Sequence, residues 1–119
     1  MLYGSDDALL EHYFKNGPEI GLGNDFLTIR SIKLYSDGAL GSRGAWLIEP
    51  YSDMPGESGH STTPVDKIYQ ICEKALQEGF QVCTHAIGDR ANREVLNQYE
   101  KAFPSSFEFL CVLTCDGIF

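Results

Sequence analysis

Basic residues are scarce in this sequence. Only 9 Lys and Arg side chains stand against 17 Asp and Glu among 119 residues, so the formal net charge at pH 7 is −8. Because nucleic-acid binding depends on clustered Lys and Arg that neutralise phosphates, a nucleic-acid partner is not expected. With 43% hydrophobic and 22% charged residues, the composition is otherwise typical of a globular domain.

Long hydrophobic runs are also missing. No stretch approaches the roughly 20 apolar residues that a membrane helix needs, and Asp6 and Asp7 lie where a signal peptide would be basic and then apolar. The four cysteines are too few and too irregularly spaced for a typical disulfide framework. We therefore expect a cytoplasmic protein with reduced thiols and no membrane partner.

What the sequence does contain is an alternation of strand and helix patterns. Apolar residues recur at helical spacing over 6–16, 64–78 and 89–103, with Thr63 as the expected N-cap of the second helix. Strand patterns cover 28–36, 80–87 and 107–113. The glycine-rich stretch 37–63 has no sustained periodicity, which is typical of a functional or disordered loop. This order predicts parallel βαβ units and an α/β fold.

Polar side chains gather at the expected carboxyl ends of two strands. Lys33 and Asp37 end the first strand, and His85 and Asp89 end the second, with Arg90 at the start of the helix behind it. Parallel α/β sheets carry their chemistry at this edge. These five residues are therefore candidate site residues.

His85 and Lys33 lie on polar faces of their strands. His85 shares a face with Gln81 and Cys83, while the apolar face would pack on helices. Imidazole suits metal ligation or proton transfer; the alternative is a core histidine bonded to a backbone carbonyl. A buried Lys33 needs a partner or a modification, and an ion pair with Asp37 is the alternative.

A glycine-spaced run, 38–44, follows the first strand. It lacks a Gly-Lys-Ser/Thr sequence, and no helical pattern starts directly after it, which argues against a phosphate cradle. A flexible substrate-facing loop in which Arg43 binds an anionic group is the better interpretation. A solvated Arg43 and a purely turn-forming Asp37 remain the alternatives.

Two longer motifs resemble a known family. One is Ile-Lys-Leu-Tyr-Ser-Asp-Gly-Ala-Leu-Gly-Ser-Arg-Gly-Ala over 32–45, followed by Glu-Pro-Tyr at 49–51; the other covers 79–91 and contains His-Ala-Ile-Gly-Asp at 85–89. Both resemble the metal-dependent amidohydrolases of the YtcJ-like group, amidohydrolase family 3. Two motifs in the family's order and separation are far more specific than either alone, and the resemblance covers roughly 21–103.

The resemblance implies a (β/α)8 TIM barrel in which a divalent metal, zinc or a similar ion, activates water to hydrolyse carbon–nitrogen bonds of amide type in a small-molecule substrate. On this mapping His85 is a catalytic metal ligand. Lys33 is the second catalytic residue, and its carboxylation would let it bridge two metals. The residues implied on the substrate side are Asp37, Arg43, Asp89 and Arg90.

The resemblance also implies residues that this chain lacks. The family's first strand carries a His-x-His pair, a later strand a Glu-His and the last strand an Asp; Phe109 falls where the later histidine would be. A complete barrel needs about 200 to 250 residues. We therefore expect a fragment with about three strands and intervening helices: a partial TIM-barrel hydrolase domain over 1–104, followed by a divergent apolar tail over 105–119.

Such a fragment should be inactive in isolation and should self-associate through its exposed sheet edges. The alternative of a different class is a small non-catalytic α/β interaction module, which would bind a partner through a sheet edge or through the apolar tail.

Overall fold

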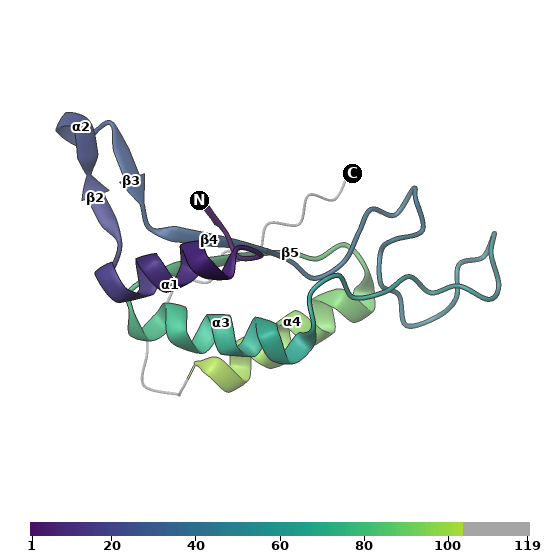
Figure 1. Cartoon of the computed structure of the whole chain (residues 1–119). Coiled ribbons are helices and arrows are strands. Elements are labelled where there is room, and N and C mark those ends of the chain that lie inside the picture. The colour runs from purple at the N-terminus through teal and green to yellow at the C-terminus, as the bar shows by residue number, and fades with distance from the viewer. Residues whose placement is uncertain (104–119) are drawn as a thin grey trace.

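The computed structural model describes residues 1–103, which form a three-stranded sheet with helices on one face and a projecting hairpin (Figure 1). The elements follow one another in the order β1 (Leu2–Tyr3), α1 (Asp7–Asn16), β2 (Glu19–Gly21), α2 (Leu22–Asp25), β3 (Leu27–Ile29), β4 (Ser31–Tyr35), α3 (Val65–Gln77), β5 (Gln81–His85) and α4 (Asp89–Ala102).

The main sheet is parallel, with strand order β1-β4-β5. Lys33 is in register with Cys83, and Tyr35 with His85. Helix α3 makes the crossover from β4 to β5, so the predicted βαβ unit and the α/β class are confirmed. Because the pairing is parallel, the carboxyl ends of β4 and β5 lie at the same edge of the sheet.

The core lies between one face of this sheet and helices α1, α3 and α4. Alternate strand residues point into it, as the period-2 pattern predicted, and the amphipathic helices cover them. The buried members include Leu2, Leu10, Phe14, Ile32, Leu34, Ile68, Ile71, Phe80, Val82 and Val95. The other face of the sheet carries the intervening residues of β4 and β5, among them Lys33 and His85.

Phe80 fastens α1 to the sheet. Its ring is 2% exposed and packs edge-on against Tyr13 and Phe14, with ring centroids 6.4 and 6.0 Å apart. Asp6 starts α1 by accepting a hydrogen bond from the Leu9 amide at 3.0 Å. The N-terminal helix of the molecule is therefore held at both its start and its apolar face.

The start of α3 differs by one residue from the prediction. Pro64, not Thr63, is the N-cap, because its extended backbone (φ −52°, ψ 136°) places the first helical residue at Val65. Gly79 then leaves the helix with a positive φ of 78°, a conformation that favours glycine. The prediction of α4 agrees with the structure to within one residue.

The prediction of one continuous strand over 28–36 is wrong. The chain leaves the sheet direction at Arg30, and the part before it, β3, pairs antiparallel with β2. Between them lies α2, a single turn in which Gly23 and Asn24 have left-handed φ values of 61° and 57°. The hairpin projects away from the three long helices (Figure 1) and leaves Phe26 92% exposed at its tip.

The segment 37–63 contains no helix or strand longer than an isolated bridge, as predicted. It is nevertheless closed by specific backbone hydrogen bonds: the Gly38 amide donates to the Gly44 carbonyl at 3.0 Å, and the Leu47 amide donates to the Ser58 carbonyl at 2.7 Å. The loop therefore has a defined path at the carboxyl edge of the sheet.

The predictions for the C-terminal residues fall outside the part of the chain that the structure describes. The predicted strand over 107–113 and the tail over 105–119 lie beyond the described residues, so the division of the chain at residue 104 stays a prediction. Among the helices of residues 1–103, none has the length and apolar character that crossing a membrane requires.

Candidate functional site

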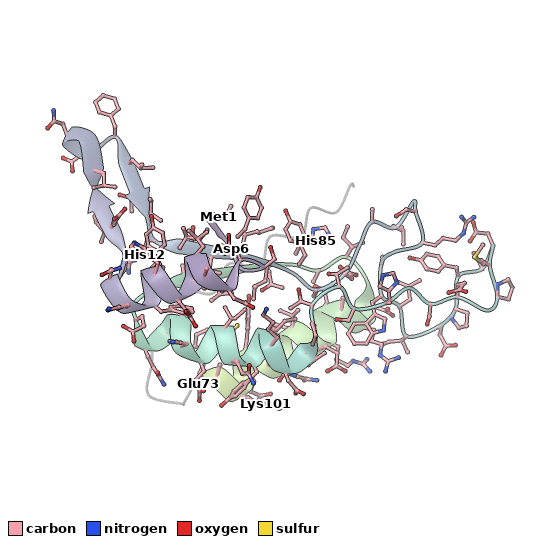
Figure 2. All side chains as sticks on the ribbon, viewed as in Figure 1. Met1, Asp6, His12, Glu73, His85 and Lys101 are labelled. Atoms are coloured by element: carbon pink, nitrogen blue, oxygen red, sulfur yellow. The ribbon has the colours of Figure 1, made fainter. Side chains whose placement is uncertain are left out.

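Lys33 and His85 lie on the same face of the main sheet, opposite the helices. They come from neighbouring strands and are displaced by two residues along them, since Lys33 is level with Cys83 and His85 with Tyr35. Figure 2 shows His85 at the end of the sheet from which the long loop departs. The strand alternation that predicted this shared face is therefore confirmed.

Tyr35 lies between these two side chains. The Lys33 Nζ atom is 5.3 Å from the centroid of the Tyr35 ring, and the Tyr35 and His85 rings are 5.4 Å apart. The first distance is within the range of a cation–π contact. Beside Lys33 is a cavity of about 400 Å³ lined by Met1, Tyr3, Lys33 and Tyr35. The lysine thus borders a cavity on the face of the sheet opposite the hydrophobic core.

Asp37 is the most densely bonded polar residue at this edge. Its side chain is buried, and its carboxylate accepts hydrogen bonds from the amides of Trp46 at 2.9 Å, Ile87 at 3.0 Å and Gly88 at 2.8 Å. These amides belong to the long loop and to the turn between β5 and α4. Asp37, just after β4, therefore joins these two segments to the end of that strand, and its role on the substrate side stays a prediction.

His85 is held through both its backbone and its ring. Its carbonyl oxygen accepts hydrogen bonds from the Ser36 amide at 2.9 Å and the Ser36 hydroxyl at 2.6 Å. The Nε2 atom lies 3.7 Å from Asp37 Oδ1, and the side chain is 13% exposed. The imidazole is thus accessible from one side and faces a buried carboxylate on the other.

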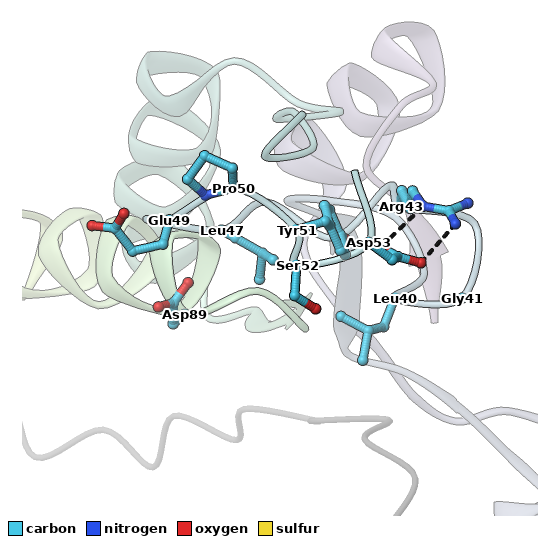
Figure 3. A pocket seen from close by; sticks show the side chains of 10 residues that line it. All are labelled: Leu40, Gly41, Arg43, Leu47, Glu49, Pro50, Tyr51, Ser52, Asp53 and Asp89. Atoms are coloured by element: carbon cyan, nitrogen blue, oxygen red, sulfur yellow. Dashed lines mark hydrogen bonds and ion pairs between the residues drawn. The ribbon is translucent and has the colours of Figure 1, made fainter. Parts of the chain in front are cut away.

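Arg43 and Asp89, both predicted to line the substrate side, border one pocket of about 540 Å³ that is formed mostly by the long loop. Figure 3 shows Arg43 and Asp53 joined at one end, with Glu49 and Asp89 at the other. The Asp89 carboxylate accepts hydrogen bonds from the amides of Ile48 at 2.9 Å and Arg90 at 2.8 Å. This carboxylate therefore ties the loop to the start of α4.

The Arg43–Asp53 pair sets the charge at its end of the pocket. The two side chains form an ion pair of 2.7 Å, and the hydrogen bond from Arg43 lowers the pKa of Asp53 below its ordinary value. The same hydrogen bond raises the pKa of Arg43. Arg43 is therefore partnered by a carboxylate within the chain.

Arg90 lies apart from that pocket wall. Its guanidinium carbon is 4.9 Å from the centroid of the Trp46 ring, a cation–π contact that supports the loop from the side of α4.

The sequence did not identify Glu49, Tyr51 and Asp53 as site residues, although they also line the pocket. The Glu-Pro-Tyr motif at 49–51 was the available signal, although it does not show which way these side chains point.

The donor set of this segment is too small for a complete metal site. Among residues 1–103, no three His, Cys, Asp or Glu side chains lie close enough together to hold a metal ion. His85 offers one nitrogen, and Lys33 would offer an anionic oxygen only if carboxylated. A typical catalytic zinc site uses three protein ligands, so the described segment fits part of such a site and not the whole.

Comparison with known proteins places the chain among hydrolases. The profile of a family described as the amidohydrolase family matches residues 6–107. The Bacillus subtilis (strain 168) protein YtcJ, named as an amidohydrolase, is 38% identical over 85 residues, which are 71% of this chain and 16% of that protein. The LONG AFTER FAR-RED 3 protein of Arabidopsis thaliana is 36% identical over 77 residues, covering 65% of this chain and 13% of its own.

Solved structures agree with these matches. An uncharacterized metal-dependent hydrolase from Pyrococcus furiosus superimposes with a TM-score of 0.74 at 37% identity, over 85% of this chain and 21% of that chain. A second, from Pyrococcus horikoshii OT3, gives a TM-score of 0.72 at 37% identity, over 83% and 20%. The chain thus spans about a fifth or less of the proteins that it matches.

Proposed function

Because the chain belongs to the amidohydrolase family, we propose that it is one part of a metal-dependent hydrolase that cleaves carbon–nitrogen bonds of a small-molecule substrate. The observation that carries the proposal is the shared face of Lys33 and His85 at the carboxyl edge of a parallel sheet. Reactive residues of α/β enzymes gather at this edge. The resemblance to metal-dependent hydrolases from two Pyrococcus species supports it.

In the whole protein, β1, β4 and β5 would be three strands of a (β/α)8 TIM barrel, with the helices on the outside. The barrel part would cover 1–104, and the tail over 105–119 would diverge from it. The face with Tyr3, Lys33, Tyr35 and His85 would then point to the barrel interior, which agrees with its polar composition and with its position opposite the helices.

His85 would supply an imidazole ligand to the metal, and Lys33, once carboxylated, an anionic one. Carboxylation converts a cation that is costly to bury into an anion that can neutralise metal charge. A bound divalent ion, zinc by the resemblance, supplies an activated water and polarises the substrate carbonyl. Arg43, Asp89 and Arg90 would contact the substrate from the loop side, and Asp37 would line the same side.

The chain by itself is expected to be inactive, because the described residues provide at most two of the ligands. Purified 119-residue protein should therefore show no metal-dependent turnover of amides or esters. Reproducible turnover that disappears on chelation would contradict this expectation.

The decisive experiment is zinc titration of the full chain by calorimetry. His85→Ala should weaken zinc binding by at least about tenfold, since even outer-shell changes at metal sites cost about 10- to 100-fold. His60→Ala, which removes an exposed imidazole from the loop, should leave the affinity unchanged. Equal zinc affinity in wild type and His85→Ala would refute the proposed role of His85. Stable self-association of a chain that binds no zinc would favour the interaction module instead.

A further inference from the structure

Three backbone amides fix the buried carboxylate of Asp37, independently of its contact with His85. Its Oδ2 accepts hydrogen bonds from the Trp46 and Gly88 amides at 2.9 and 2.8 Å, and its Oδ1 accepts one from the Ile87 amide at 3.0 Å. Because these donors come from two segments, rotating the carboxylate would break bonds to both. Its orientation toward His85 is therefore set by the backbone.

The backbone of His85 is fixed next to that carboxylate, and its ring lies between the carboxylate and Tyr35. Ser36 holds the His85 carbonyl with two hydrogen bonds, of 2.9 and 2.6 Å, and the Tyr35 ring lies 5.4 Å from the imidazole. In this arrangement Nε2 is the ring nitrogen that faces Asp37 Oδ1, at 3.7 Å. Tyr35, Ser36 and Asp37, which are consecutive at the end of β4, thus contact and position His85.

We infer that Asp37 is a positioning residue that selects the Nε2–H tautomer of His85 and so makes Nδ1 the electron-pair donor of the ring. An ionised carboxylate is only an acceptor. It attracts an N–H dipole on Nε2 and repels a lone pair there. The identity of what Nδ1 binds rests on the proposed function, in which Nδ1 would face the metal, because a metal-binding histidine commonly donates its other ring N–H to a carboxylate.

Replacement of Asp37 by Asn separates this role from a merely structural one. The side-chain oxygen of Asn should take the Oδ2 position, where it keeps two of the three amide hydrogen bonds. Its NH2 group then lies at the Oδ1 position and donates toward His85 Nε2. Because this donor favours a lone pair on Nε2, the hydrogen of the His85 ring should move to Nδ1. A purely structural Asp37 would lower stability on this substitution and leave the tautomer as it was.

The test is long-range ¹H–¹⁵N NMR of the metal-free 119-residue chain, recorded where His85 is neutral and assigned by comparison with His85→Gln. In the wild type, Nδ1 should show the shift of a nitrogen without hydrogen. In Asp37→Asn, it should show the shift of a nitrogen that carries one. Asp89→Asn is the matched control, because Asp89 also accepts an amide hydrogen bond from the loop, at 2.9 Å from Ile48. It should leave the tautomer unchanged.

The inference is overturned if the wild-type ring carries its hydrogen on Nδ1, a result that needs no variant to fold. It is equally overturned if Asp37→Asn keeps a dispersed amide spectrum and the wild-type tautomer. Since no metal is added, these outcomes are independent of the zinc titration. If Asp37→Asn inverts the tautomer but His85→Ala leaves the zinc affinity unchanged, the role of Asp37 is supported and only the proposed function is refuted.

Discussion

Gly88 offers a sharp test of how the loop is seated on the sheet. A Cβ atom at this position would overlap the backbone of Trp46, including its carbonyl oxygen. The backbone of Gly88 itself is ordinary, with φ −64° and ψ 148°, so alanine carries no conformational penalty there. Any loss of stability in Gly88→Ala therefore measures the close approach of the two segments.

The expected loss follows from the contacts that must yield. Overpacking a closely fitted site costs about 1 to 3 kcal/mol, and a lost hydrogen bond to a charged group costs about 1.5 to 3 kcal/mol. Trp46 and Gly88 both donate to Asp37, so displacing either segment breaks at least one such bond. We expect a loss of about 3 kcal/mol in the free energy of unfolding, a large part of the about 5 to 15 kcal/mol typical of a domain.

Urea unfolding followed by the fluorescence of Trp46, the single tryptophan, is the appropriate assay. With a slope of about 1.5 kcal/mol per M, the midpoint should fall by about 2 M. Gly41→Ala is the control, because a Cβ at Gly41 meets nothing within 4 Å and its φ is not positive; it should be neutral or slightly stabilising. A Gly88→Ala protein with wild-type midpoint and emission would refute the description of this contact.

Two other changes test the core and the pocket. Phe80→Ala should lower the free energy of unfolding by about 3 to 5 kcal/mol, because it removes a buried ring and its contacts with α1. Phe80→Leu should lower this free energy much less. If urea unfolding shows a loss below about 1 kcal/mol for Phe80→Ala, the packing of this ring against α1 is contradicted. Arg43→Gln should raise the pKa of Asp53 toward its ordinary value, as followed by NMR of the carboxyl carbon against pH. Because the pair lowers this pKa, its stabilisation is present above the ordinary carboxyl pKa and is lost as the pH falls through the lowered value; an unchanged titration of Asp53 would show that the ion pair does not persist in solution.

The parts of the fold that the sequence predicted are those with a repeated local pattern. Alternation in β4 and β5 placed Lys33 and His85 on one face, and the apolar stripes of α3 and α4 located both helices to within one or two residues. These patterns are visible in the sequence because each of these strands and helices buries one face, so its apolar residues recur at the spacing of the element. Strand β1 was missed, since its two residues, Leu2 and Tyr3, are too short to show a period.

The candidate site was harder to predict because its contacts join distant segments. The glycine after Asp37 suggested a turn former, and the family resemblance suggested a residue on the substrate side. Its three amide donors lie 9, 50 and 51 residues away in the chain, so no local pattern could identify it as an anchor. The break at Arg30 was missed for a similar reason, because the pairing of β3 with β2 is decided by the left-handed turn at Gly23 and Asn24.

The hydrogen bond between the Leu47 amide and the Ser58 carbonyl divides the long loop into an anchored base and an outer excursion. The base, bound to Asp37 and Ser36, cannot change without disturbing the sheet, whereas 49–57 begins and ends at one point and contributes much of the pocket wall. Two contacts hold this excursion to the base: the buried Tyr51 hydroxyl donates to the Ala45 carbonyl at 2.8 Å, and Asp53 forms an ion pair with Arg43. A different stretch of sequence between Ile48 and Ser58 that keeps Tyr51 and Asp53 would reshape the pocket while the frame beneath it stays intact.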